Sequence, residues 1–369
     1  MTDTIRMITW NANGLISRLR ELEVFLHTNY IDIALISETH LTNKNFIKIQ
    51  GYQAYSTVHP TGSARGGSTI FIKQTLQHYQ QEAIQEDYFQ GTVITIQQPR
   101  GNLNIAAAYC PPCYRVDKQQ FANIFKKLGH KFILAGDFNA KHTAWGSRLI
   151  TPKGRELLKA LNEAACDFHS SRKPTHWPTN PAHIPDLLDF FITKGITLTY
   201  LEVESIADLS SDHTPVLLTL STTIIKKTPK KTLTTKSTDW DIFRDNLDAL
   251  INLKIPLKTI QDLEQQTQEF INAIRTAAEQ ATPQQRDLIQ PPISYPIEVW
   301  ELLTERRRRR RIWHQTRNPL DKRTFNHTSN KLRNLLKSLR EKSLTAYLEN
   351  LSPTADKDYS LWRATKRFK

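Results

Sequence analysis

The stretch that most constrains the fold is an apolar run, residues 132–135, together with the polar residues that follow it. The run is typical of a buried strand, and Gly136 is expected to end that strand and let the backbone turn. If extended geometry continued past Gly136, the side chains of Asp137 and Asn139 would share one face. The sequence thus predicts a carboxylate and a carboxamide at the carboxyl end of a central strand, where open α/β sheets bind ligands. A plain Asp/Asn turn explains these residues equally well when they are taken alone.

Other polar residues also follow predicted strands. Asn11 comes after a strand at residues 5–10, and Glu38 comes after a strand at 31–36. A carboxylate just past a buried strand is well placed to bind a metal, although Glu38 alone could equally be an acidic residue at a helix N-terminus. Further strands are predicted at 68–73, 91–98 and 103–109, the last two forming a hairpin, and helices at 15–30, 116–129 and 153–165.

Asp189 lies inside a predicted strand at residues 187–193, among apolar neighbours. A buried aspartate is costly unless another group pairs with it. His213, just before a last strand at 216–220, would supply that partner, and Asp189 would then orient the imidazole. By default, a histidine in such a turn is a surface residue.

Cys110 and Cys113, separated by two prolines, have the spacing of a redox pair. A redox pair should open a helix, whereas these residues follow a strand, so we do not expect redox chemistry here. A zinc site would need further ligands at a matching spacing, and none is evident. Three cysteines in 369 residues argue for a reducing compartment and against a disulfide framework.

The length of 369 residues predicts about two domains, and 39% hydrophobic residues suffice for a core. No apolar run approaches the ~20 residues of a membrane span, so no membrane partner is expected. The net charge of +14 is unevenly spread. Residues 1–220 hold 21 Lys+Arg and 19 Asp+Glu, a net of +2, and residues 221–369 hold 29 and 17, a net of +12. A basic segment attached to a neutral domain suggests a polyanionic partner, nucleic acid above all.

The basic part begins with a Thr/Lys-rich stretch at 223–238 that has the composition of a linker. Amphipathic helices are expected around 243–251 and 260–274, followed by one long helix over 300–351. Inside that long helix lie six consecutive arginines: Arg306, Arg307, Arg308, Arg309, Arg310 and Arg311. Six in a row circle the whole helix, so we expect them to contact phosphates rather than read bases. A solvated tract or a nuclear-import signal is the alternative.

Six short motifs carry a resemblance to a known family. In order, they are residues 10–14, 37–40, 109–112, 136–139, 188–190 and 211–213. Together they resemble the exonuclease–endonuclease–phosphatase superfamily over about residues 4–221. Within that superfamily the chain looks like the apurinic-type endonuclease of non-LTR retrotransposons, most like the jockey clade of LINE elements. Residues 239–369 look like the segment that joins this endonuclease to a reverse transcriptase, and no polymerase motif is seen.

The resemblance implies an α/β fold of four layers, in which two mixed β-sheets pack face to face between helices, followed by a helical basic extension. It also implies a Mg²⁺-dependent phosphodiesterase, with Mn²⁺ as a substitute. Glu38 and Asn11 would bind the metal, with Asp212 as a second ligand or as the acid. Asp137 would activate or orient the attacking water, while His213 contacts the phosphate. The remaining predicted phosphate contacts are Asn139, Tyr109 and Thr175.

We therefore expect an endonuclease domain at 1–222 that folds by itself, a linker at 223–238 and a basic helical region at 239–369. The expected function is nicking of a DNA duplex to give a 3′-hydroxyl that primes reverse transcription, with element RNA as a further candidate partner. An apurinic/apyrimidinic repair endonuclease and a non-catalytic nucleic-acid-binding fragment are the alternatives. A phosphatase acting on lipids or small phosphates is disfavoured by the basic region. The expected location is the nucleus and cytoplasm, and the oligomeric state is not predicted.

Overall fold

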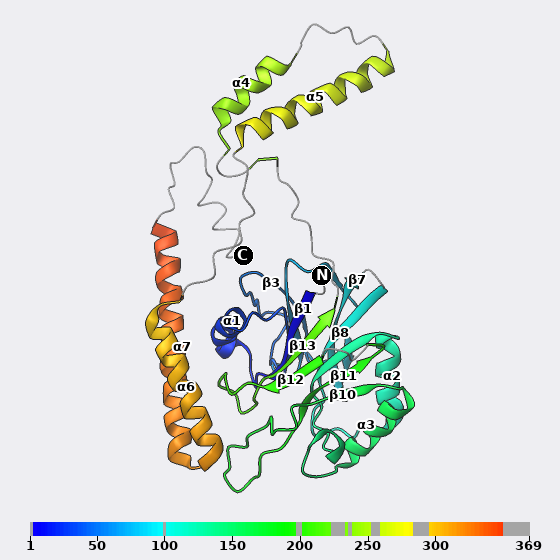
Figure 1. Ribbon diagram of the computed structural model, residues 1–369, viewed down its shortest axis with the longest axis vertical. Helices are drawn as coiled ribbons and strands as arrows, with labels where there is room; N and C mark the ends of the chain where they lie inside the picture. Colours follow the sequence, from blue (N-terminus) through cyan, green and yellow to red (C-terminus); the bar gives the residue numbers. More distant parts are fainter. Residues whose placement is uncertain are drawn as a thin grey trace. The chain divides into compact units, whose positions relative to one another are not determined.

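The computed structural model describes residues 3–98, 101–196, 201–222, 233–234, 238–251, 259–282 and 295–349. It forms two compact units, residues 1–227 with 295–369, and residues 228–294. The first unit contains two sheets flanked by helices, as Figure 1 shows. The helices after residue 295 group with the first unit. The division into a domain at 1–222, a linker at 223–238 and a basic region at 239–369 stays a prediction. Whether residues 1–222 fold alone stays a prediction.

The first sheet has six strands in the order β12-β13-β1-β2-β4-β3. Only β1 and β2 are parallel within it, and they pair from Met7 with Ile33 to Asn11 with Ser37. The bounds are β1 Asp3–Asn11, β2 Ile33–Ser37, β3 Tyr52–Thr57, β4 Ser68–Lys73, β12 Leu201–Ser205 and β13 Val216–Thr222.

The second sheet has seven strands in the order β10-β11-β9-β8-β7-β5, with β6 also paired to β7. Its parallel pair is β8 with β9, which runs to Tyr109 opposite Asp137. The bounds are β5 His78–Gln80, β6 Ile84–Glu86, β7 Phe89–Gln98, β8 Gly101–Tyr109, β9 Phe132–Asp137, β10 Asp167–His169 and β11 Asp189–Lys194.

Three apolar clusters hold the four layers together. One fills the space between the sheets, with Met7 and Leu35 from the first facing Ile105 and Ile133 from the second. Another lies between the first sheet and α1 (Leu19–Thr28), and a third between the second sheet and α2 (Lys118–Leu128) and α3 (Pro152–Glu163). The predicted four-layer α/β fold is therefore confirmed.

Gly136 differs from its prediction. It does not end the strand, since β9 continues to Asp137. A Cβ at this position would collide with the carbonyl oxygen of Ala108, which lies opposite on β8. Glycine is therefore required because the two strands approach closely, and that approach places Asp137 beside the end of β8.

The predicted long helix is two helices. α6 (Ile297–Thr316) ends at Arg317, whose φ is +56°, and α7 (Pro319–Glu349) begins at a proline. A left-handed residue is a common helix end, and proline cannot continue the preceding helix. In Figure 1 the two helices run side by side, and they pack against α1 through an apolar cluster of Val24, Val299, Leu303, Leu332 and Leu336.

Two arginines of α6 also form ion pairs with other parts of the first unit. Arg306 is fully buried and pairs with Glu21 of α1, at 2.7 Å, and with Asp208. Arg307 adds a second contact to Asp208, at 2.6 Å. Burial alone would raise the pKa of Asp208, but the charges of Arg306 and Arg307 outweigh it and hold that pKa below its usual value.

The second unit contains α4 (Trp240–Leu250) and α5 (Ile260–Ala281), close to the two predicted amphipathic helices. Side chains of Asp239 and Thr259 cap their N-termini. Among the helices that the structure describes, none combines the length and the apolar character that a membrane crossing requires.

Replacing Arg306 with methionine is expected to lower the free energy of unfolding by about 3–5 kcal/mol, because Glu21 and Asp208 would stay buried without their partner. Chemical denaturation of the full chain measures this change. Arg311→Met is the control: that arginine is exposed, so its loss should change stability by no more than about 0.5 kcal/mol. Equal effects of the two substitutions would contradict a buried ion-pair network.

Candidate active site

The candidate site lies at one edge of both sheets. The parallel strands β1, β2, β8 and β9 all end there. The antiparallel strand β11 begins there, with Asp189 opposite Asp137. The turn that contains His213 precedes β13, which also starts at this edge. The strand registers thus gather most of the predicted polar residues in one place.

Asn11 connects two carboxylates that come from different sheets. Its Nδ2 donates hydrogen bonds to Glu38 Oε2 and to Asp137 Oδ2, each at 2.8 Å. Its own Oδ1 accepts the backbone N–H of Asn13 at 2.9 Å. Asn11 thus lies beside Glu38 and also contacts Asp137, while the predicted binding of a metal by Asn11 and Glu38 stays a prediction. An amide nitrogen must face this pair, because an amide oxygen there would meet two negatively charged groups.

Asp189 orients His213 as predicted. His213 Nδ1 and Asp189 Oδ2 are 2.7 Å apart, and both side chains are buried. The other ring nitrogen, Nε2, lies 4.0 Å from Asp137 Oδ2. Burial would lower the pKa of His213, but the charges of Asp189, Asp137 and Asp212 outweigh it and raise this pKa to about 10.

Asp137 is held by backbone and side-chain donors. Its Oδ1 accepts the N–H of Asn139 at 2.9 Å, and its own N–H donates to the Ser37 hydroxyl at 3.2 Å. Burial and the charge of Asp189 raise the pKa of Asp137 to about 7, against the opposing charge of His213. The site therefore concentrates negative charge in a region of low exposure.

Asn139 and Tyr109 both lie near Asp137. Asn139 has a φ of +45°, so extended geometry does not continue past the strand, and its Nδ2 donates to the Cys110 carbonyl oxygen at 3.2 Å. Tyr109 is buried, and its pKa is raised, first by burial and then by the charges of Glu38 and Asp137. The Cys110 thiol is also buried, which raises its pKa to about 12 and keeps it protonated.

Asp212 and His176 form a second polar pair beside His213. Asp212 accepts a hydrogen bond from Asn13 Nδ2 at 3.2 Å and lies 3.7 Å from His176 Nε2. Burial would raise the Asp212 pKa, but His176, His213 and Asn13 together lower it. The His176 ring packs on His213 with 4.7 Å between centroids. Thr175 was predicted from the sequence and its neighbour His176 was not, although a histidine close to a predicted site residue was an available signal.

Four residues around the site have left-handed backbone conformations that are unusual outside glycine. They are Asn13, Glu38, His40 and Asn139. Such conformations cost free energy, persist only where the surroundings impose them, and cluster at functional sites. His40, also missed at the sequence level, lies with Nε2 3.3 Å from Glu38 Oε1.

Thr175 does not face the open site. It is fully buried, and its hydroxyl oxygen accepts the N–H groups of Leu188 at 3.0 Å and Asp189 at 3.1 Å. This geometry suits a residue that places Asp189, not one that contacts a phosphate. Two of the six arginines are likewise unsuited to phosphate contact, because Arg306 and Arg310 are fully buried.

Two groups of described side chains have ligand atoms close enough to share an ion, namely His176 with Asp212 and His213, and Asp137 with Asp189 and His213. Neither group contains Glu38. Glu38 is partly exposed, and its two oxygens face Asn11 and His40. The carboxylate oxygens of Glu38 are the kind of ligand that a hard divalent cation prefers.

The fold and site together define a nuclease or phosphatase of the four-layer α/β type. Residues 8–213 match the Endonuclease/Exonuclease/phosphatase family, and the chain belongs to this family. It is 34% identical to the RNA-directed DNA polymerase from mobile element jockey of Drosophila melanogaster, over 99% of this chain and 40% of that protein. It is 32% identical to the probable RNA-directed DNA polymerase from transposon BS of the same species, over 99% of this chain and 41% of that protein.

The chain thus spans about two fifths of the length of these relatives. Among solved structures, it is similar to the endonuclease domain of TRAS1, a telomere-specific non-LTR retrotransposon, with 21% identity and a TM-score of 0.51 over 59% of this chain and 99% of that one. The AP endonuclease LMAP from Leishmania major is 15% identical with a TM-score of 0.50, over 59% of this chain and 88% of that one. These likenesses show a shared fold, and the resemblance predicted from the motifs is confirmed.

Replacing Thr175 with valine should remove the acceptor for two buried N–H groups. We expect a loss of about 1–3 kcal/mol in the free energy of unfolding, the usual cost of an unsatisfied buried polar group. Thr175→Ser keeps the oxygen and should stay close to wild type in chemical denaturation. If valine were as stable as serine at this position, the hydroxyl would have no positioning role.

Proposed function

We propose that this chain is a Mg²⁺-dependent endonuclease that nicks duplex DNA and leaves a 3′-hydroxyl to prime reverse transcription. The observation that carries the proposal is the continuous set of contacts from Asp189 through His213 to Asp137, and from Asp137 through Asn11 to Glu38. Phosphodiester hydrolysis needs a positioned water, neutralised phosphate charge and a stabilised leaving oxygen, and these groups can supply all three.

The chain's own residues take distinct roles in this proposal. Asp137 orients the attacking water and accepts its proton, while Asn139 holds the phosphate. His213, oriented by Asp189, donates a hydrogen bond to a phosphate oxygen and steadies the charge that develops there. Tyr109, protonated and close to both Glu38 and Asp137, contacts the same phosphate.

A divalent cation would bind at Glu38, which offers carboxylate oxygens at the edge of the site. Asn11 would contribute the second lone pair of its carbonyl oxygen, and Asp212 is a candidate second ligand. When bound, the ion would supply Lewis-acid stabilisation of the leaving oxygen. Mg²⁺ is the proposed ion, with Mn²⁺ as a substitute, because both prefer oxygen ligands.

The relatives support the priming role over a repair role. Their similarity extends over 99% of the chain, well past the 8–213 segment that matches the family. A nuclease attached to a polymerase in one protein would supply primer ends to it, in the nucleus where target DNA is found. The AP endonuclease neighbour has the same fold at 15% identity, which does not specify a substrate.

Alanine in place of Asp137, His213 or Glu38 should each reduce plasmid nicking by about 10²–10³-fold or more, because each change removes a group that acts on the reacting phosphate. The fold should survive, since all three residues lie at or next to strand ends, outside the apolar clusters. Circular dichroism checks the fold, and initial nicking rates measure the effect. Wild-type-like nicking by Asp137→Ala, with contamination excluded, would refute the site assignment.

Metal removal offers an independent test of the same proposal. EDTA should abolish nicking by the wild-type chain, and added Mg²⁺ or Mn²⁺ should restore it. Glu38→Ala should need more metal for the remaining activity, whereas Asp189→Asn should not change the metal requirement. Nicking that persists in EDTA would rule out the metal-dependent mechanism.

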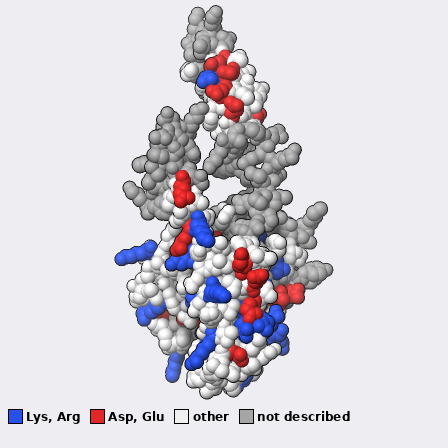
Figure 2. All heavy atoms as spheres, turned by 90° about the vertical axis from the view of Figure 1, so that its left-hand side faces the viewer, with Lys and Arg blue, Asp and Glu red and all other residues white. Residues whose placement is uncertain are grey.

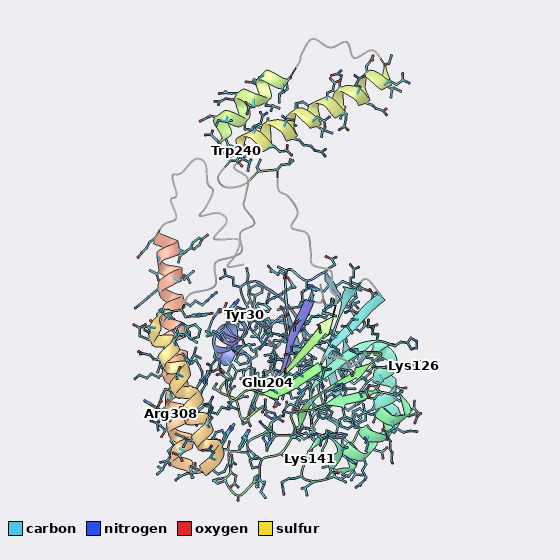
Figure 3. The ribbon with its side chains drawn as sticks, viewed as in Figure 1. Tyr30, Lys126, Lys141, Glu204, Trp240 and Arg308 are labelled. Carbon is cyan, nitrogen blue, oxygen red and sulfur yellow. The ribbon has the colours of Figure 1, made fainter. Side chains whose placement is uncertain are left out.

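The exposed arginines of α6 are proposed to contact DNA phosphates. Arg308 and Arg311 are exposed, and Figure 3 places Arg308 on the outer side of α6. Arg308 pairs with Glu305 at 2.8 Å, an exposed pair of little energetic value that a phosphate can displace. On the face seen in Figure 2, basic and acidic side chains are interspersed, so we expect moderate affinity without sequence preference.

Arg308→Gln with Arg311→Gln should flatten the slope of log affinity against log salt by up to about 1.8, since each lost phosphate contact removes about 0.9. The matched control is Lys126→Gln with Lys127→Gln, which removes two exposed charges from α2. Figure 3 places Lys126 on the opposite side from Arg308. The position of the nick should not move. An equal change of slope in both double variants would mean that only net charge matters.

A further inference from the structure

The loop that carries His213 is contacted from behind by α6, a helix outside the family match. This loop, residues 208–214, lies against the inward face of α6, where Arg306 and Arg310 are fully buried. Guanidinium groups are rarely buried unless several acceptors surround them. Here the acceptors are supplied by the loop itself and by Glu21 of α1.

Arg310 contacts the loop at three points. Its guanidinium donates hydrogen bonds to the carbonyl oxygen of Leu209, to that of His213 at 2.9 Å and to the Thr214 hydroxyl at 3.2 Å. The ring of Phe325 on α7 lies under the same guanidinium, 5.6 Å from its carbon. Burial and the charge of Arg306 lower the pKa of Arg310 to about 10, so the group is charged at neutral pH.

The loop needs such support because of its backbone. Leu209 has a φ of +61°, a left-handed conformation that is unfavourable for a branched apolar residue. Asp208, at the start of the loop, is held by Arg306 and Arg307. The His213 carbonyl oxygen also accepts from Trp10 Nε1 and from the Ser211 hydroxyl, each at 3.1 Å. Three donors therefore fix the backbone oxygen of the residue whose ring pairs with Asp189.

We infer that Arg310, together with Arg306, is a positioning residue for the proposed nicking reaction. The two arginines hold loop 208–214 in the conformation that places the His213 ring between Asp189 and Asp137. α6 thus completes the active site from outside the segment that matches the family. This inference rests on the proposed function for its catalytic consequence, and on the contacts alone for its effect on the loop.

A purely structural role of Arg310 makes a different prediction. If the arginine only attached α6 to the domain, its loss would lower stability without changing the turnover of the molecules that remain folded. If it positions the loop, turnover falls even at temperatures well below the unfolding transition, because His213 no longer meets the phosphate in the right geometry. The loop amides should then also exchange faster with solvent.

The test uses the full chain with Arg310→Ala, Arg310→Lys and the control Gln315→Ala, whose side chain is exposed on the same helix. For each protein, kcat and KM for nicking of one duplex are measured at a temperature well below the unfolding transition. Hydrogen–deuterium exchange is followed over residues 206–215. Free guanidinium chloride at tens of millimolar is added to Arg310→Ala, because it can occupy the vacated space and restore the lost hydrogen bonds.

We expect kcat of Arg310→Ala to fall about 10–100-fold, the usual effect of removing a partner that orients a site residue. KM should change much less, loop exchange should accelerate, and guanidinium should restore part of kcat. Arg310→Lys keeps the charge but loses the planar fork, so it should lie between alanine and wild type. Gln315→Ala should match wild type in both measurements.

Unchanged loop exchange in Arg310→Ala would overturn the inference, and so would faster exchange with unchanged kcat. Equal losses in Arg310→Ala and Gln315→Ala would also overturn it. The failure of the proposed function looks different. In that case the wild-type chain itself would not nick DNA with Mg²⁺, while the exchange measurement would still report whether Arg310 holds the loop.

Discussion

One amide nitrogen joins the two sheets at the candidate site, and the rest of the site depends on it. Asn11 Nδ2 donates to Glu38, next to its own sheet, and to Asp137 in the other sheet. Two carboxylates so close repel each other, and donors between them lower that cost. The apolar core between the sheets fixes the distance across which this amide must reach, so the packing of the core and the geometry of the site are coupled.

Much of the fold and site follows from the sequence, because polar residues after apolar strands are a local signal. Asp137 and Glu38 were placed by that signal, whereas the Asp189–His213 pair follows from the cost of burying an aspartate alone. The short strands β3, β5, β6, β10 and β12 were not predicted. Three to six residues carry too little periodicity, and these strands form because neighbouring strands offer hydrogen bonds.

The remaining features depend on contacts that are distant in sequence. Gly136 looked like a strand end, but its role is set by Ala108 on the neighbouring strand. The arginine run looked like a polyanion-binding tract. Val299, Leu303 and Trp313 form a stripe of alternating four- and three-residue steps that passes through positions 306 and 310. That stripe was present in the sequence. It predicts that Arg306 and Arg310 face inward if charged residues are also considered for burial.

Above all, we propose that this chain nicks intact duplex DNA and leaves an end that a polymerase can use. The most direct measurement is to incubate the wild-type chain with Mg²⁺ and a supercoiled plasmid free of abasic sites, and then to offer the nicked product to a DNA polymerase with labelled nucleotides. We predict nicking without any abasic site, followed by extension from the nick. Cleavage that occurs only at abasic sites, or nicks that cannot be extended because they end in a 3′-phosphate, would contradict the claim.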